Sequence, residues 1–587
     1  MRLSAKSYGV MGAWLAAGAV HAEVPPVTPV VAADTPAQVV FEVVLAEIAL
    51  KRDKPQVALA AYADLALKYS APDIFRRTFE VAALNRQPEL MLEAARLWVQ
   101  KEPDSTEALN VLASTQILLG RYDEAQPVLV RYFALLPDDR RPQELLRLGQ
   151  RFPAQADPKA IRKLVDAVTQ PYLSVPDAQL ARAQAALRAG DDAAALEAVQ
   201  RARGLQPDSE SGVLFDAQIL SKRSPAAALK AFSDYLARYP NAASIRAIYA
   251  QQLLAADKAV DARAQLQVLV AQPAIAPEPL FAAAAIAVQA QDSPLAIRAL
   301  QRLLTMDSVD ASLIEYNLGL AYESQGELNR SRGEQPSEAT ADSDAVLHYL
   351  KVQPGEYYVA ARMRAANLLA RQGDLNAARA LLQTTPAKDD ATRAELVIGE
   401  ATLVRDNGDV AGAFNLVDAA LKQDPSSILL RYERGMLAER SGRMALFEQS
   451  MREVIKRDPK YAQAYNALGF TYADRNIRLK EARTLLEKAL ALSPNDPFIL
   501  DSMGWLYYRE KNYAVALEFL NRAVALRQDP EIVEHQIVVL KAMGRDDEAV
   551  RVWRAGLQQF PDNQALRARG KALGLDHASP LVPSQSL

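Results

Sequence analysis

The chain has 587 residues, of which 50% are hydrophobic and 24% are charged, and its formal net charge is −3. Glycine and proline are not abundant, so the composition is that of a folded protein and excludes a mainly disordered chain. The slightly acidic balance provides no positive surface for nucleic acid, and the absence of cysteine excludes disulfides and a lipid-modified cysteine.

Residues 1–22 have the pattern of a secretory signal peptide. Arg2 and Lys6 supply a positive end, a thirteen-residue run from Tyr8 to Val20 is largely apolar, and Val20-His21-Ala22 forms a small-residue cleavage site. The apolar run is too short to remain as a membrane-spanning helix. We therefore expect a periplasmic protein that is exported by a cleaved signal peptide, is not lipidated and has no direct membrane span.

A proline-rich leader and an unusually apolar helix follow. Residues 23–37 carry four prolines and no helical pattern, which predicts an extended leader. The next segment has more apolar surface than a helix covered on one face needs, and Val40, Phe41, Val44 and Ile48 are part of it. Two interpretations stay open: neighbouring helices bury this first helix, or it docks a partner.

From residue 38 to residue 576 a small residue recurs at a nearly constant interval. The interval is about 34 residues, apart from one longer step, and this is the length of the tetratricopeptide helix-turn-helix repeat. Met91 and Phe447 fill two of the recurring positions, and alanine fills the others. The alanines are Ala58, Ala125, Ala160, Ala195, Ala228, Ala262, Ala296, Ala345, Ala378, Ala413, Ala482, Ala516 and Ala549.

Glycines and prolines recur in step with these positions. A glycine such as Gly120, five residues before the small residue, can adopt the positive φ that ends a first helix, and a proline such as Pro137, twelve residues after it, ends the second. Gly469 and Gly504 fall where the two helices of a repeat cross. The resemblance to the tetratricopeptide family is closest in residues 462–530. It implies an all-α fold, a right-handed superhelix of about fifteen helical pairs.

Three segments interrupt this pattern. Residues 137–175 contain five prolines and are expected to be irregular. The polar stretch Asn329–Asp344 separates the two helices of one repeat, and we expect a mobile loop there, either a tolerated insertion or a contact loop. The tail His577–Leu587 is expected to be disordered.

The sequence offers no catalytic or metal-binding motif. It contains no HExxH zinc motif, no P-loop and no dinucleotide-binding glycine fingerprint. Beyond the signal peptide the only histidines are His348, His535 and His577, which fall in different repeats or in the tail. We expect His348 and His535 to lie on helix surfaces. We therefore expect no enzyme activity, no metal and no cofactor.

Binding is then expected at the inner wall of the superhelix, which the first helix of each repeat forms in tetratricopeptide proteins. Aromatic side chains and arginine dominate binding energy when a groove exposes them. The alternative is that each side chain packs between neighbouring repeats. By resemblance, the predicted wall residues are Tyr432, Met436, Glu439, Arg440, Asn466, Phe470, Asp474, Phe498, Asp501, Trp505, Tyr508 and Arg509.

Several stretches resemble a narrower family of long exported bacterial tetratricopeptide proteins. They are Val44–Leu50, Ala94–Val99, Asn466–Arg475 and Leu500–Trp505, and the last contains the most specific element, Asp-Ser-Met-Gly-Trp. This family includes the lipoprotein adaptor that partners the periplasmic carboxyl-terminal processing protease and presents cell-wall (peptidoglycan) hydrolases to it. The resemblance implies the same protein partners, without the lipid. The alternative is a structural scaffold of an envelope machine, for polysaccharide export or outer-membrane assembly.

Overall fold

The computed structural model describes residues 37–69, 71–307, 309–333 and 341–577. Within these residues the secondary structure consists of helices and contains no strand, which confirms the predicted all-α fold. The predicted signal peptide (1–22), leader residues 23–36 and tail residues 578–587 lie outside the described residues. Two compact units divide the chain, residues 1–272 and 273–587, and the single continuous solenoid stays a prediction. None of the described helices has the length and apolar character needed to cross a membrane.

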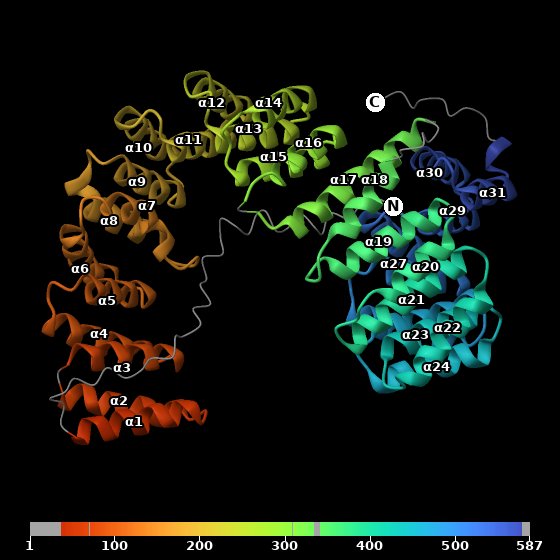
Figure 1. Cartoon of the computed structure of the whole chain (residues 1–587), viewed down its shortest axis with the longest axis horizontal. Helices are drawn as coiled ribbons and strands as arrows, with labels where there is room; N and C mark the ends of the chain where they lie inside the picture. The colour runs from red at the N-terminus through yellow and green to blue at the C-terminus, as the bar shows by residue number, and fades with distance from the viewer. Residues whose placement is uncertain (1–36, 70, 308, 334–340, 578–587) are drawn as a thin grey trace. The chain divides into compact units, whose positions relative to one another are not determined.

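In the first unit, helices follow one another as packed pairs (Figure 1). Apart from α7 and α8, each helix contacts its pair partner, and most pairs contact the next pair through the adjoining helix. The helices are α1 (Ala37–Lys51), α2 (Pro55–Lys68), α3 (Pro72–Leu84), α4 (Pro88–Lys101), α5 (Thr106–Leu118), α6 (Tyr122–Leu135), α7 (Arg141–Arg147), α8 (Pro158–Thr169), α9 (Pro176–Arg188), α10 (Asp192–Leu205), α11 (Glu210–Arg223), α12 (Pro225–Arg238), α13 (Ala243–Ala255) and α14 (Ala259–Ala271).

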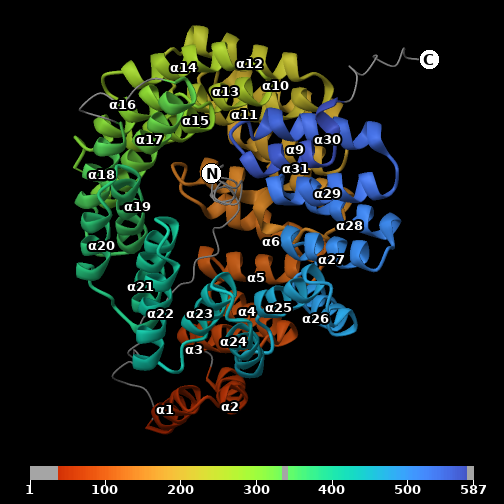
Figure 2. The ribbon, with the colours of Figure 1, turned by 90° about the vertical axis from the view of Figure 1, so that its right-hand side faces the viewer.

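The second unit repeats the same arrangement. The first helices α25, α27 and α29 also contact one another in succession and lie side by side (Figure 2). The helices are α15 (Pro277–Gln289), α16 (Ser293–Leu303), α17 (Ala311–Ser331), α18 (Ala341–Lys351), α19 (Tyr358–Arg371), α20 (Leu375–Thr384), α21 (Asp390–Asp406), α22 (Val410–Gln423), α23 (Ile428–Arg440), α24 (Met444–Arg457), α25 (Ala462–Asp474), α26 (Leu479–Leu492), α27 (Pro497–Arg509), α28 (Tyr513–Leu526), α29 (Pro530–Ala542), α30 (Asp546–Gln559) and α31 (Gln564–Ala572).

Small residues determine the geometry inside each repeat. The recurring alanines Ala482 and Ala516 are fully buried between the two helices of their repeats. At Gly504 an added Cβ would lie 2.7 Å from Cγ of Leu520, which explains why this crossing needs glycine. The turn residue Gly120 has a φ of 70°, the left-handed conformation that the sequence predicts there.

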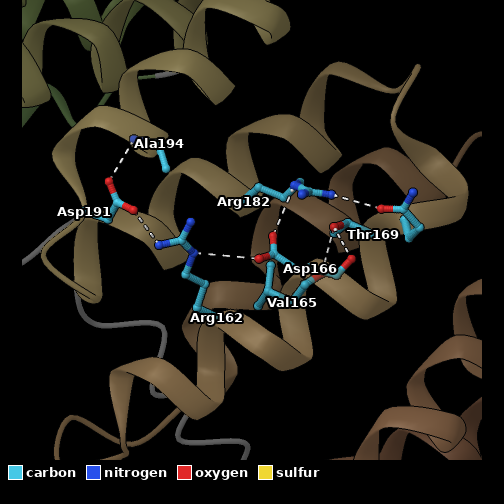
Figure 3. A network of polar contacts seen from close by, with 8 residues as sticks. Arg162, Val165, Asp166, Thr169, Arg182, Asp191 and Ala194 are labelled. Atoms are coloured by element: carbon cyan, nitrogen blue, oxygen red, sulfur yellow. Dashed lines mark hydrogen bonds and ion pairs between the residues drawn. The ribbon is translucent and has the colours of Figure 1, made fainter.

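The proline-containing segment 137–175 departs from the regular pairing, because α7 packs against α9, and α8 packs against α6 and α9. Helix α7 has only seven residues and continues into a 3-10 turn at Leu148–Arg151. The polar network of Figure 3 then ties α8 to its successors, because the Arg162 guanidinium lies 2.7 Å from Asp191 and 3.7 Å from Asp166. The Ala194 N–H and Arg162 both stabilise the charged carboxylate and hold the pKa of Asp191 below its usual value.

The insertion expected at Asn329–Asp344 is shorter than predicted. Helix α17 continues to Ser331 and α18 begins at Ala341, so both ends of the stretch are helical. An ion pair between Arg330 and the largely buried Asp342 joins these two extensions. Polarity suggested a loop, but the charges on the two extensions pair with each other. Residues 334–340 lie outside the described residues.

Candidate functional site

The predicted inner-wall residues come from three successive first helices and recur at the repeat interval. Three rows result: Tyr432, Asn466 and Asp501; Met436, Phe470 and Trp505; and Arg440, Asp474 and Arg509. Residues one repeat apart occupy the same place on equivalent helices, so each row runs across α23, α25 and α27. We call these nine residues, together with Tyr508, the C-terminal wall.

The α23 part of this wall is partly accessible. Tyr432 and Met436 are half-buried, and the Tyr432 ring lies 5.4 Å from the ring of Tyr461. Arg440 is exposed. Burial raises the pKa of the nearby Glu433 above its usual value, although the charges of Arg405 and Arg440 act in the opposite direction. This part therefore offers aromatic and thioether surface beside an exposed cation.

The α27 part is packed more tightly. Trp505 is only 7% exposed, and its indole Nε1–H donates to Asp474 at 3.1 Å. Its ring stacks on Tyr508 at 4.7 Å, and the Arg509 guanidinium lies over it at 4.9 Å. Arg509 also donates to the backbone carbonyl of Asp474 at 2.6 Å. Trp505 therefore packs between repeats, which is the alternative that the sequence left open.

Asp501 is also buried, and its partner is a histidine that sequence reasoning misplaced. His535 is 8% exposed rather than on a helix surface, and its Nδ1 lies 2.8 Å from Asp501 Oδ1. The imidazole stacks on Trp505 at a centroid distance of 4.1 Å. A signal existed in the sequence, because His535 follows Asp501 by 34 residues, one repeat. The physical reason for burial is this pairing, which gives both polar groups a partner away from water.

The prediction for His348 also needs correction. Its side chain is only 14% exposed, its Nδ1 lies 2.5 Å from Glu315, and its ring stacks on Tyr322 at 5.2 Å. The histidine is partly buried because a carboxylate and an aromatic ring from α17 contact it.

The first helix exposes the apolar residues that the sequence singled out. Phe41 is 62% exposed, and Val44 and Ile48 are each 42% exposed, whereas Val40 is half-buried. Glu47 attaches the helix to its pair partner and to the next repeat, since it accepts from the Tyr62 hydroxyl of α2 at 2.6 Å and from Arg77 of α3 at 2.7 Å. The interpretation that neighbouring helices bury the whole of α1 is therefore wrong for the described part of the chain, and docking stays a prediction.

Lack of enzyme activity stays a prediction, and the described residues bear on it in two ways. No group of three or more histidine, aspartate or glutamate side chains among them is placed to hold a metal ion. Beside the Asp501–His535 pair, the Ser502 hydroxyl donates to the Phe498 carbonyl at 2.8 Å and not to the imidazole. This geometry fits a structural role for the pair, because nucleophilic catalysis needs the base to contact the hydroxyl.

Comparisons with known proteins agree with the repeat period. The sequence profile of the tetratricopeptide repeat matches residues 145–210, 281–346, 398–461 and 448–497. A TPR repeat-containing protein of Pseudomonas aeruginosa is 35% identical over 227 residues, a match that covers 39% of this chain and 36% of that relative.

Solved structures include similar helical repeats. A thermophilic TPR protein from Thermus thermophilus is 22% identical, with a TM-score of 0.30, and the match covers 31% of this chain and 99% of that one. Yeast Tom70 is 15% identical, with a TM-score of 0.38, and the match covers 75% of this chain and 97% of that one. The repeat period, the paired helices and the profile match together show that the chain contains tetratricopeptide repeats, units that serve as protein-binding scaffolds.

Proposed function

We propose that this chain is a periplasmic adaptor that binds a carboxyl-terminal processing protease and presents cell-wall hydrolases to it for degradation. The proposal combines the protein-binding character of the repeats with the resemblance of Val44–Leu50 and Leu500–Trp505 to exported adaptors of this kind. Such an adaptor needs no catalytic group, because holding protease and client together raises their effective concentration.

The observation that carries the proposal is the uncovered apolar face of α1. The turn residues Asp53 and Arg86 mark equivalent places in the first two repeats, 33 residues apart. By the same interval, Ile74 is the equivalent of Phe41, and Val81 is the equivalent of Ile48.

In the second repeat this face is covered by a helix. Ile74 and Val81 are buried, and Thr78 on the same face donates to the Tyr62 carbonyl of α2 at 3.0 Å. The corresponding residues of α1 are exposed because the described chain places no helix against them. A face shaped to receive a helix, and left uncovered, supports docking of the protease through an apolar helical segment.

The clients are proposed to bind at the C-terminal wall. Its accessible members include Tyr432, Met436, Phe470 and Arg440, residue types that often dominate binding energy. Tyr432, Met436 and Phe470 pack against the buried core that includes Trp505. Protease and client would thus use different units of the chain, which suits a bridging role.

A reconstituted digestion tests the proposal. A purified protease and a candidate hydrolase are incubated with and without the adaptor, and the hydrolase half-life is measured. Wild-type adaptor should shorten the half-life, whereas the double variant F41E/I48E should not. Leu118→Glu is the matched control, because Leu118 is 57% exposed on another first helix of the same unit and should tolerate the charge.

Two outcomes would count against the proposal. An unchanged half-life together with no ternary complex would remove the adaptor role and leave the envelope-scaffold alternative. Equal loss of acceleration in the α1 variant and in Leu118→Glu would show a general effect of added charge and no specific docking helix.

A further inference from the structure

A buried ion pair joins two successive repeats at the C-terminal end of the second unit. Asp501 lies on α27 and His535 on α29, and the imidazole Nδ1 is 2.8 Å and 3.0 Å from the two carboxylate oxygens. Asp501 is 5% exposed, so its carboxylate is largely removed from water. A buried carboxylate without a counter-charge destabilises a fold. His535 is the one cationic partner that Asp501 has among the described residues.

Aromatic rings hold the imidazole in place. Trp505 stacks on it with an interplanar angle of 22°, and the Phe470 ring of α25 lies 6.0 Å away. Trp505 is itself fixed by Asp474, which in turn is bonded to Arg509 at 3.2 Å. The imidazole therefore cannot turn away from Asp501 without disturbing three successive first helices.

The charged groups around His535 are mainly acidic. Glu531 and Glu534 lie on its own helix, and Arg569 of α31 is bonded to Glu534 at 2.6 Å. From α28, the neutral Asn521 is hydrogen-bonded to Gln536 at 2.7 Å. Burial alone would lower the pKa of His535, but the hydrogen bond and charge of Asp501, with the charges of Glu531 and Glu534, outweigh it and raise that pKa above its usual value.

We propose that His535 forms a proton-dependent ion pair that holds together the repeats that begin with α27 and α29. The charged imidazole holds α29 against α27, and loss of its proton leaves Asp501 buried without a counter-charge and loosens the C-terminal end of the wall. The device depends on the contacts within the chain and not on which partner binds.

The direction of the pH effect follows from linkage. Because the folded state holds the proton more tightly than the unfolded chain, the stabilisation is complete below the ordinary histidine pKa of about 6.5. It is lost as the pH rises through the raised pKa of the folded state. The wall should therefore be tightest below about pH 6.5 and loosen as the pH rises through the raised pKa of His535.

A histidine titration by NMR tests the first step. The chain has four histidines, so the resonance that disappears in His535→Gln identifies this residue. Its midpoint should lie above about 6.5 in the wild type and move to lower pH in Asp501→Asn, which keeps a hydrogen-bond acceptor but removes the charge. A wild-type midpoint at or below 6.5 would overturn the proposal.

Hydrogen exchange tests the second step. Protection factors for α29 and α31, corrected for the intrinsic pH dependence of exchange, should fall about tenfold between pH 6 and pH 9 in the wild type. They should change little in His535→Gln, while His348→Gln, a matched change in another repeat, should behave like the wild type. A fall of the same size in His535→Gln would refute the proton-dependent ion pair. If that variant does not fold, a loss of the pH response in Asp501→Asn decides the same question.

Discussion

Replacement of Trp505 distinguishes a supporting role in the core from a contact role on the surface. The indole is 93% removed from solvent, stacks on His535 and donates one hydrogen bond to Asp474. Trp505→Ala leaves a cavity beside His535, and large-to-small changes of this kind cost about 3–5 kcal/mol. Trp505→Phe keeps the stacking surface and loses mainly the hydrogen bond to Asp474. The Asp474 side chain is 53% exposed and can bond to water instead, so Trp505→Phe should cost about 1 kcal/mol.

The measurement is urea unfolding followed by circular dichroism, combined with hydrogen exchange, because repeat proteins can open locally. The matched control is Phe498→Ala, since Phe498 is 41% exposed on the same helix and should lose less than about 1 kcal/mol. The lost stability should appear mainly in the peptides of α25, α27 and α29.

If Trp505→Ala proves as stable as Phe498→Ala, the packing argument is wrong. If instead Trp505→Ala unfolds the C-terminal repeats while Trp505→Phe folds and still binds its partner, then Trp505 supports the wall and does not make the contact itself.

Three further predictions have defined outcomes. Gly504→Ala should destabilise by about 1–3 kcal/mol because its Cβ would meet Leu520. Gly442→Ala, where the added Cβ has open space, should cost only the smaller strain of a positive φ, and equal losses in urea unfolding would contradict this order. Glu433→Gln should be neutral or stabilising by up to about 1 kcal/mol at pH 7. The difference in stability between the variant and the wild type should vanish as the pH falls through the raised pKa of Glu433. Parallel unfolding curves at pH 4 and pH 7 check this. Amino-terminal sequencing of envelope-extracted protein should begin at Glu23, and an intact residue 1 would refute export.

The repeat period allowed the fold to be predicted from the sequence. Ala482 and Ala516 are buried and Gly504 lies at a helix crossing, because only small side chains fit where two helices of a repeat approach. This constraint acts within each repeat, so it recurs along the sequence at the repeat interval. The ends of α17 and α18 depend on the Arg330–Asp342 pair between two extensions, and composition alone does not show such a pair.

The candidate site was harder to predict, because the burial of each wall residue depends on the neighbouring repeat. Met436, Phe470 and Trp505 occupy the same place in three repeats, yet only Trp505 is nearly inaccessible. The difference comes from the next helix, where His535 stacks on the indole. The repeat rule predicted which way these side chains point but not what covers them.

The same reasoning separates residues that support the wall from residues that a partner can reach. Phe41 is exposed where its equivalent Ile74 is buried, because α2 covers the later helix and nothing in the described chain covers the earlier one. On the wall, α29 covers Trp505, whereas Tyr432 and Met436 are only partly buried. A partner can gain binding energy only from surface that the fold leaves open. Contacts are therefore expected at α1 and at the α23 part of the wall, and substitutions on α27 should act on binding mainly through stability.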